Sequence, residues 1–273
     1  MIRTALGLLL LAACARSGDP AADRRAIELP VELLEVSGLA MASPTSVFAH
    51  NDERAVIHEI ELADGRVLRS FALGDPAEAD DFEGIAAGGD HIYLIASTGR
   101  LLVAEPGENG ARQPFEEYDT GVGAACEIEG LSLAPEPGNL LIVCKTLPRG
   151  ERQGRLVIYQ WSIAARARIE RPWLDIDLDE ALGAQSDDFA PSGIEWVPAD
   201  RRILVISARA RRMIVLDEQG AVLATHRLAP ARHPQAEGVT VIGNWLLIAD
   251  EGERGRPARI AAYPFPLPDA AAQ

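Results

Sequence analysis

Short apolar runs, separated by turn residues, dominate the chain. Within residues 55–62 and 66–73, apolar and polar positions alternate, which is typical of strands with one buried face. Ala63-Asp64-Gly65 lies between these two runs, and an Asp-Gly pair in that position predicts a β-hairpin. No segment shows a sustained helical period. The pattern therefore predicts an all-β fold.

Other runs are almost wholly apolar. Residues 91–96 read His-Ile-Tyr-Leu-Ile-Ala, and residues 139–144 read Asn-Leu-Leu-Ile-Val-Cys. Strands of this kind need apolar neighbours on both faces. The stacked sheets of a β-propeller provide them, because each sheet packs between two others.

A phrase of Ser or Glu, then Gly, then an aliphatic residue recurs five times. Three of the four spacings between its glycines are 45 or 46 residues, and the spacing between Gly130 and Gly193 is longer. The glycines are Gly38, Gly84, Gly130, Gly193 and Gly238. Repetition with this period indicates one supersecondary unit repeated five times. The extra residues of the longer spacing fall in 148–154 and 179–191, which we expect to form surface loops.

The last repeat stops near Phe265, after only three strands. Residues 26–30 precede the first phrase and read as a strand, so we expect them to supply the missing one. The prediction is a five-bladed β-propeller closed by an N-terminal strand that completes the last blade. Closure of this kind removes the exposed sheet edges.

The N-terminus predicts export. Residues 1–13 carry an early positive charge and an apolar stretch too short to span a bilayer, and Cys14 follows small residues, as in a bacterial lipobox. We expect a lipoprotein signal peptide over 1–13, a lipidated Cys14 with a tether over 14–25, and one propeller domain over 26–268. Ala15 after the cysteine favours the outer membrane, facing the periplasm. An ordinary secretory signal is the alternative.

The formal net charge of −15 excludes a nucleic-acid partner, which would need a basic surface. It favours attraction of cations. Two further cysteines, Cys126 and Cys144, lie in the third repeat, where an exported protein can form a disulfide. Two buried free thiols are the alternative.

The residue before each repeated glycine lies where an innermost strand begins, so these five side chains converge on the axis. They are Ser37, Glu83, Glu129, Ser192 and Glu237. Converging carboxylates repel one another unless they are protonated, paired or bound to a cation. Calcium accepts oxygen ligands in loose geometry and fits this set. The alternative is that each glutamate bonds neighbouring backbone amides.

A second layer of polar residues follows the second strand of each blade, on one rim of the channel. Its candidates are Asn51, Asp52, Lys145, Arg209, Asp250 and Glu251. The acidic members can extend a cation site. Lys145 and Arg209 can either meet an anionic ligand or neutralise the glutamates.

Other motifs give weaker signals. Asp175-x-Asp177-x-Asp179 resembles the start of a calcium loop but lacks the glycine at position six and the glutamate at position twelve, so we read it as a strand with one acidic face. No nucleophile elbow, P-loop or paired-histidine zinc motif occurs. His50, beside Asn51-Asp52, is the only candidate base.

The ordered motifs resemble the SdiA-regulated family of bacterial propellers. The residues that carry the resemblance run from the first repeat to the fifth: Ser37-Gly-Leu-Ala, Asp81-Phe-Glu-Gly-Ile-Ala, Ile128-Glu-Gly-Leu-Ser, Val143-Cys-Lys, Ser192-Gly-Ile and Pro234-Gln-Ala-Glu-Gly-Val. The resemblance implies a five-bladed propeller, distantly similar to NHL-repeat proteins, with bound calcium in some members.

The sequence thus leaves two functional hypotheses. The first is a non-catalytic, lipid-anchored envelope propeller that binds calcium near its axis together with a small-molecule ligand or an envelope protein. The second is a calcium-dependent hydrolase of an ester, lactone or phosphoester, in which the cation would polarise the substrate.

Overall fold

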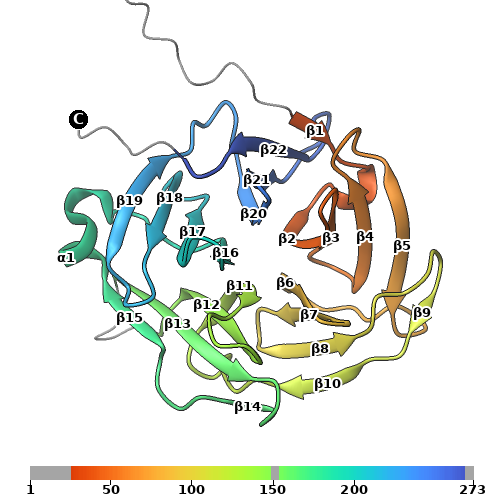
Figure 1. Ribbon diagram of the computed structural model, residues 1–273, viewed down its shortest axis with the longest axis horizontal. Coiled ribbons are helices and arrows are strands. Elements are labelled where there is room, and N and C mark those ends of the chain that lie inside the picture. The colour runs from red at the N-terminus through yellow and green to blue at the C-terminus, as the bar shows by residue number, and fades with distance from the viewer. Residues whose placement is uncertain (1–25, 149–153, 268–273) are drawn as a thin grey trace, which may run out of the picture.

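Five antiparallel sheets surround a common axis in the computed structural model (Figure 1). The structure describes residues 26–148 and 154–267. The predicted signal peptide, Cys14 and the tether lie outside the described residues, as does residue 268 at the predicted domain end. The all-β, five-bladed propeller predicted from the repeat is confirmed.

Each blade is a meander whose first strand lies nearest the axis. Blade one contains β2 (Val36–Ser43), β3 (Ser46–Asn51), β4 (Val56–Glu61) and β5 (Val67–Leu73). Blade two contains β6 (Phe82–Gly88), β7 (His91–Ala96), β8 (Arg100–Ala104) and β10 (Glu116–Asp119). Blade three contains β11 (Glu127–Leu133), β12 (Asn139–Thr146), β13 (Arg155–Ser162), β14 (Ala167–Arg168) and β15 (Leu174–Asp177). Blade four contains β16 (Gly193–Val197), β17 (Arg202–Ser207), β18 (Arg212–Leu216) and β19 (Val222–Arg227). Blade five contains β20 (Ala236–Ile242), β21 (Trp245–Asp250) and β22 (Arg259–Pro264).

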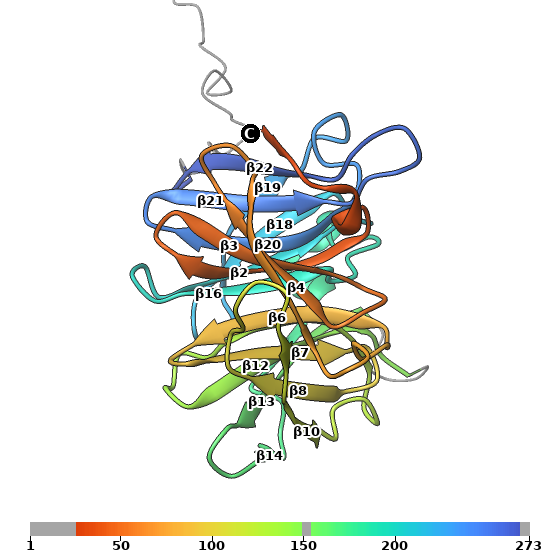
Figure 2. The ribbon, with the colours of Figure 1, turned by 90° about the vertical axis from the view of Figure 1, so that its right-hand side faces the viewer.

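The N-terminal strand closes the ring. β1 (Ala26–Glu28) pairs antiparallel with β22, which places the first strand of the chain at the outer edge of blade five (Figures 1 and 2). Ile27 lies opposite Ile260 and is buried against it in the same core cluster. The predicted ring closure is therefore confirmed, with a strand two residues shorter than expected.

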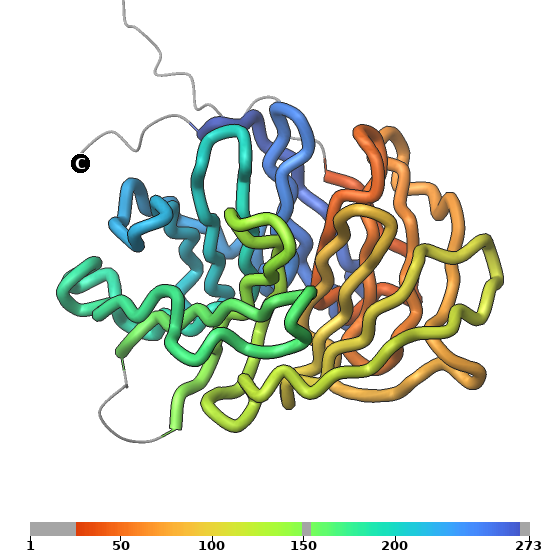
Figure 3. Tube along the Cα trace, turned by 60° about the horizontal axis from the view of Figure 1, so that its bottom comes forward, coloured from red at the N-terminus to blue at the C-terminus, as the bar shows by residue number. Residues whose placement is uncertain are grey.

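Two elements depart from the prediction. Between β8 and β10 the chain crosses to blade one, where β9 (Arg112–Gln113) adds a short parallel strand to β5 (Figure 3). The stretch expected to be a loop over 179–191 instead contains most of α1 (Leu178–Leu182) and the 3-10 turn η3 (Gly183–Gln185). A second 3-10 turn, η2 (Val31–Leu33), precedes β2.

The acidic run before α1 is only partly a strand. β15 ends at Asp177, whose side chain accepts a hydrogen bond from the Glu180 amide and caps α1. Capping of this kind satisfies an amide that the helix itself leaves unpaired. Asp175 and Asp177 both pair with Arg155 on β13. The reading of this run as one acidic-faced strand is therefore wrong beyond Asp177.

Five apolar clusters form the core, one at each junction between neighbouring blades. Alternate residues of a middle strand point into different clusters. On β12, Ile142 packs toward blade two, whereas Leu141 and Val143 pack toward blade four. This two-sided burial explains why the middle strands are apolar at nearly every position. Within the described ranges, no helix is long and apolar enough to cross a membrane.

Candidate functional site

The five repeated phrases meet at the axis, as the spacing predicted. Their residues line a narrow channel whose free space, about 10 Å³, is close to that of one water molecule. A side-chain carbon added at Gly84 would lie 2.5 Å from the amide nitrogen of Leu131 on the neighbouring inner strand. Glycine is therefore required at this position because the inner strands approach one another closely.

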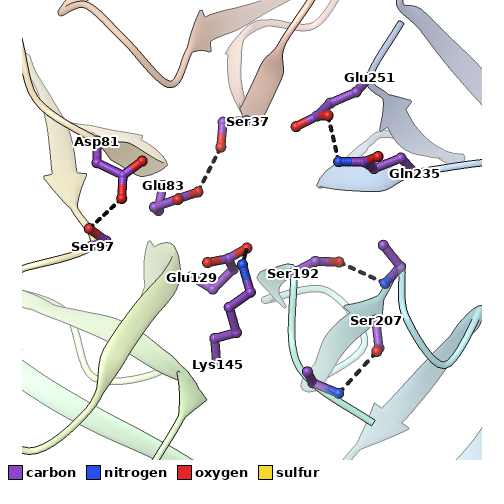
Figure 4. A network of polar contacts seen from close by, with 12 residues as sticks. Ser37, Asp81, Glu83, Ser97, Glu129, Lys145, Ser192, Ser207, Gln235 and Glu251 are labelled. Carbon is purple, nitrogen blue, oxygen red and sulfur yellow. Dashed lines mark hydrogen bonds and ion pairs between the residues drawn. The ribbon is translucent and has the colours of Figure 1, made fainter. Parts of the chain in front are cut away.

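Glu83 lies at one mouth of this channel and bonds across to blade one. The Ser37 hydroxyl donates to its Oε2 at 2.9 Å (Figure 4). Burial, followed by repulsion from Glu129, raises the pKa of Glu83 to about 8. At neutral pH this carboxyl therefore binds a proton for much of the time unless another cation replaces it.

Glu129 faces the same mouth from blade three. Lys145 Nζ donates to its Oε1 at 2.5 Å, whereas its Oε2 is buried without a hydrogen-bond partner among the described residues (Figure 4). Burial raises the pKa of Glu129 to about 7, although Lys145 opposes that shift. Within the described ranges, the site thus contains a buried carboxylate oxygen that accepts no hydrogen bond.

Lys145 is the only lysine of the chain. Burial acts to lower its pKa, but the bond with Glu129 and the charges of Glu83 and Glu237 outweigh that effect, and the pKa lies above its usual value. The one ammonium group is therefore held charged among the axial glutamates. The sequence left open whether Lys145 meets an anionic ligand or neutralises the glutamates. Its ion pair with Glu129 favours neutralisation.

Glu237 and Glu251 complete the acidic set from blade five. Burial, then repulsion from Glu129 and Glu251, raises the pKa of Glu237 to about 9. Burial, then the nearby charges of Asp52 and Glu35, raises the pKa of Glu251 to about 7. Glu251 Oε2 accepts a hydrogen bond from Gln235 at 2.5 Å.

Asp52 belongs to the same electrostatic group. Burial, then the charges of Glu35, Glu53 and Asp81, raises its pKa, and its Oδ1 has no partner within the described part of the chain. We call the group formed by Ser37, Asp52, Glu83, Glu129, Lys145, Glu237 and Glu251 the axial mouth.

Sequence reasoning did not assign Glu35 and Asp81 to this site. Both lie two positions before the first residue of a repeated phrase, as do Glu127 and Gln235 in their own blades. Glu35 and Asp81 each directly precede an inner strand, and the strand register shifts immediately after them, so alternation along a strand does not predict their direction. Asp81 accepts a hydrogen bond from Ser97 at 2.7 Å (Figure 4).

Ser192 reaches the axis but bonds backbone atoms. Its hydroxyl donates to the Ala236 carbonyl at 2.6 Å and accepts from the Ala208 amide at 3.0 Å. Ser207 likewise accepts from the amides of Ala190 and Ala210 (Figure 4). In blade four these hydroxyls join segments of the fold, and the acidic side of the mouth lies on the other four blades.

Three of the expected rim residues lie outside the axial mouth. Asn51 closes the turn after β3, accepting from the Arg54 amide. Arg209 is exposed and pairs with Asp188 at 2.6 Å. Asp250 is buried on the face of β21 that it shares with Ile248, where its Oδ2 lies 2.8 Å from His233 Nδ1.

His50, the candidate base, is fully buried. Its Nδ1 donates to the Asn51 carbonyl, and its Nε2 packs against Gly38 without a hydrogen-bond partner among the described residues. Burial lowers its pKa to about 4. A neutral ring with no exposed nitrogen is unsuited to proton transfer at the mouth.

A disulfide lies next to two residues of the mouth in blade three. Cys126 and Cys144 are joined, and they directly precede Glu127 and Lys145. The bond therefore ties the start of β11 to the end of β12, the two strands that carry Glu129 and Lys145. Of the two states considered from the sequence, the structure has the disulfide.

The donors at the mouth are hydroxyl and carboxylate oxygens, the ligand type that hard cations such as calcium prefer. The unpartnered Oε2 of Glu129 fits such an ion. Among the residues that the structure describes, however, no three acidic, histidine or cysteine side chains already form a compact metal-binding group. A bound ion would therefore need the glutamates to move toward one another.

Comparison with solved structures places the chain among propeller-like folds. A glutaminyl cyclase of Myxococcus xanthus matches with a TM-score of 0.57 at 12% identity, covering 88% of this chain and 94% of that chain. A luciferin-regenerating enzyme matches with a TM-score of 0.53 at 11% identity, covering 88% and 95%. At these identities the likeness concerns the fold alone.

No curated protein gives a significant match. The model of the SdiA-regulated family, however, matches residues 27–243, from the closing strand β1 to the hairpin of the fifth blade. That span contains all three axial glutamates and Lys145. The chain therefore belongs to the SdiA-regulated family.

Proposed function

We propose that the axial mouth is a cation-binding site and that calcium is its ion. Glu83, Glu129 and Glu237 would be the acidic ligands, with the Ser37 hydroxyl beside them. The observation that carries this proposal is the gathering of these carboxyls at one mouth, where burial raises the pKa values of all three and repulsion from neighbouring acidic groups adds to the rise. A divalent cation bound between them would offset two of the three negative charges while the carboxyls stay ionised.

Lys145 gives the site a built-in competitor. Its ammonium supplies part of the compensating charge through Glu129, and it stays within electrostatic reach of the other two glutamates. When an ion binds, we expect this flexible side chain to leave Glu129, which frees Oε1 beside the unpartnered Oε2. Calcium suits such a site better than magnesium, which demands a near-ideal octahedron.

We propose binding rather than catalysis as the role of this site. The histidine considered as the base of the hydrolase alternative, His50, is buried and has a low pKa, so it gives that alternative no support. Asp52 and Glu251 of the axial mouth, with Asp81 beside Asp52, would contact a small-molecule ligand or an envelope protein presenting positive charge.

A calcium titration by calorimetry tests the proposal. The protein is first stripped of metal with a chelator and then titrated with calcium and, separately, with magnesium. We expect calcium to bind tighter than magnesium, and Glu129→Gln and Glu83→Gln each to weaken it by at least about tenfold, the effect of ~1.4 kcal/mol.

Glu136→Gln is the matched control. Glu136 is exposed in the β11–β12 hairpin, at the opposite end of blade three. The Glu136→Gln substitution should leave the calcium affinity unchanged. Absence of calcium heat, or equal affinity in the two mouth variants and the control, would overturn the proposal.

We further propose that the domain is held in the bacterial envelope by lipid on Cys14, on the outer membrane facing the periplasm. The support is the lipobox-like sequence before Cys14, together with a disulfide that an exported protein can form. Replacement of Cys14 by Ala should move the protein from the detergent-soluble membrane fraction to the periplasm. Retention in the membrane fraction would contradict this location.

A further inference from the structure

A second cavity lies between blades four and five, apart from the axial mouth. Its volume is about 410 Å³, within the range of small-molecule sites. β18, β19, β21 and β22 contribute to its walls. Two arginines, Arg227 and Arg232, are among the lining residues, and the apolar part of the lining consists of Met213, Leu228, Ala229, Leu246, Ile248, Pro264 and Leu267.

A buried polar chain lies in one wall of this cavity. Asp250 Oδ2 lies 2.8 Å from His233 Nδ1, and the other ring nitrogen, Nε2, forms a hydrogen bond with the Tyr263 hydroxyl. Asp250 and His233 are almost completely buried, and Asp250 Oδ1 has no partner among the described residues. Burying such a pair is unfavourable without compensation, so its position beside a cavity suggests a role beyond packing.

Arg232 lies at the same cavity and is half-buried. Its guanidinium forms no hydrogen bond or ion pair with any other described side chain, although the chain has a net charge of −15. Arg259 fixes the Arg232 backbone by donating to its carbonyl and to that of Ala231. The loop over 229–233 is therefore anchored, and it holds the Arg232 charge close enough to act on Tyr263. The other arginine of the cavity, Arg227, is exposed on β19.

We propose that this cavity, which we call the inter-blade cavity, binds a small amphiphilic carboxylate. The aliphatic part of the ligand packs against the apolar wall between Met213, Leu246 and Ile248. Its carboxylate pairs with Arg232, beside the Asp250–His233–Tyr263 chain.

The chemistry of the walls selects this class of ligand. An apolar cavity of this size stabilises a hydrocarbon chain by removing it from water. A half-buried guanidinium gains most from a carboxylate, whose planar geometry it matches with paired hydrogen bonds. A neutral alcohol would leave that charge without a partner, and a cationic amphiphile would be repelled.

Calorimetry with decanoate, decanol and decyltrimethylammonium, all below their aggregation concentrations, tests the proposal. Decanoate should bind, decanol should bind at least about tenfold more weakly, corresponding to ~1.4 kcal/mol, and the cationic probe should give no saturable heat. Acetate, which lacks the chain, should also fail to bind.

Two variants locate the site. Arg232→Gln should abolish the preference for decanoate over decanol, and Ala229→Phe should fill the cavity from an exposed position and block both ligands. Arg66 is an exposed arginine on blade one, and Arg66→Gln is the control that should leave binding of both ligands unchanged.

The proposal would be overturned if none of the probes bound, or if decanoate binding persisted unchanged in both cavity variants. Chelation of calcium should not change decanoate binding, which separates this test from that of the axial mouth.

Discussion

At the scale of single residues, Lys145 decides how the axial mouth behaves without a bound ion. Replacing it with Met removes a charge that opposes repulsion among the glutamates and also competes with any cation. We expect Lys145→Met to lower the melting temperature of the ion-free protein and to tighten calcium binding by about threefold to tenfold, a difference near 1 kcal/mol. Thermal melts and calorimetry measure both effects. Weaker calcium binding in this variant would mean that Lys145 supports the site rather than competes for it.

Substitution of Gly84 tests whether the inner strands need glycine for their close approach. A methyl group there would meet the backbone of Leu131, which cannot move aside, so Gly84→Ala should destabilise the fold by about 1–3 kcal/mol. Gly88 lies on the same strand, but its added carbon would meet only the flexible end of the Leu133 side chain. Gly88→Ala should therefore cost much less. Urea unfolding of the pair compares them, and equal losses would contradict this packing.

Single residues also mark the limit of the sequence reasoning at the site. The repeated phrase predicted Glu83 and Glu237 at the axis, where both line the channel, and Glu129 lies close enough to raise the pKa values of both. Asp250 was expected at the rim but is buried against His233, because the side-chain direction of a residue at a strand end depends on local register. Its neighbour Glu251 instead belongs to the mouth. Spacing alone does not separate these two cases.

At the scale of elements, the Cys126–Cys144 disulfide links stability to the site. It closes a segment of 18 residues, and a loop near that length gains about 3 kcal/mol from cross-linking. Replacing both cysteines with Ser should lower the free energy of unfolding by about that amount and also weaken calcium binding, since Glu129 and Lys145 lie on the tethered strands. Reduced wild-type protein should behave like the double variant. Unchanged calcium affinity in the double variant would show that the disulfide acts on stability alone.

The strands were predictable because hydrophobic pattern and turn residues agree. The middle strand β7 has the predicted bounds and β12 extends the predicted run to Thr146, since burial on both faces leaves the interior of each strand apolar. β9 and α1 were missed, because two residues of parallel pairing and five residues of helix carry too little periodicity to be recognised. β9 lies at the outer edge of blade one and α1 follows β15, so both are remote from the inner strands that carry the repeated phrase.

At the scale of the whole molecule, the axial mouth makes stability depend on pH. The pKa values of Glu83, Glu129, Glu237 and Glu251 rise from 4.5 to about 8, 7, 9 and 7 on folding. Between pH 4.5 and 9 the folded protein therefore binds more protons than the unfolded chain does, and these groups lower the free energy of unfolding as pH rises. The ion-free protein should melt at a lower temperature at pH 8.5 than at pH 6.

Calcium should reverse this trend, because it replaces the protons at the same carboxyls. Its stabilisation should be larger at pH 8.5 than at pH 6, where protons compete more strongly. Thermal melts at the two pH values, with chelator and with calcium, measure the difference. Glu237→Gln should reduce the pH dependence of the ion-free protein. A calcium effect that is equal at both pH values would place the ion elsewhere.

A crystal structure grown with calcium tests the central claim most directly. The account predicts a single strong peak at the axial mouth, with carboxylate oxygens of Glu83, Glu129 and Glu237 about 2.3–2.6 Å away. Lys145 should have left Glu129. An axis without such a peak, with Lys145 still bonded to Glu129 at a saturating calcium concentration, would contradict the account.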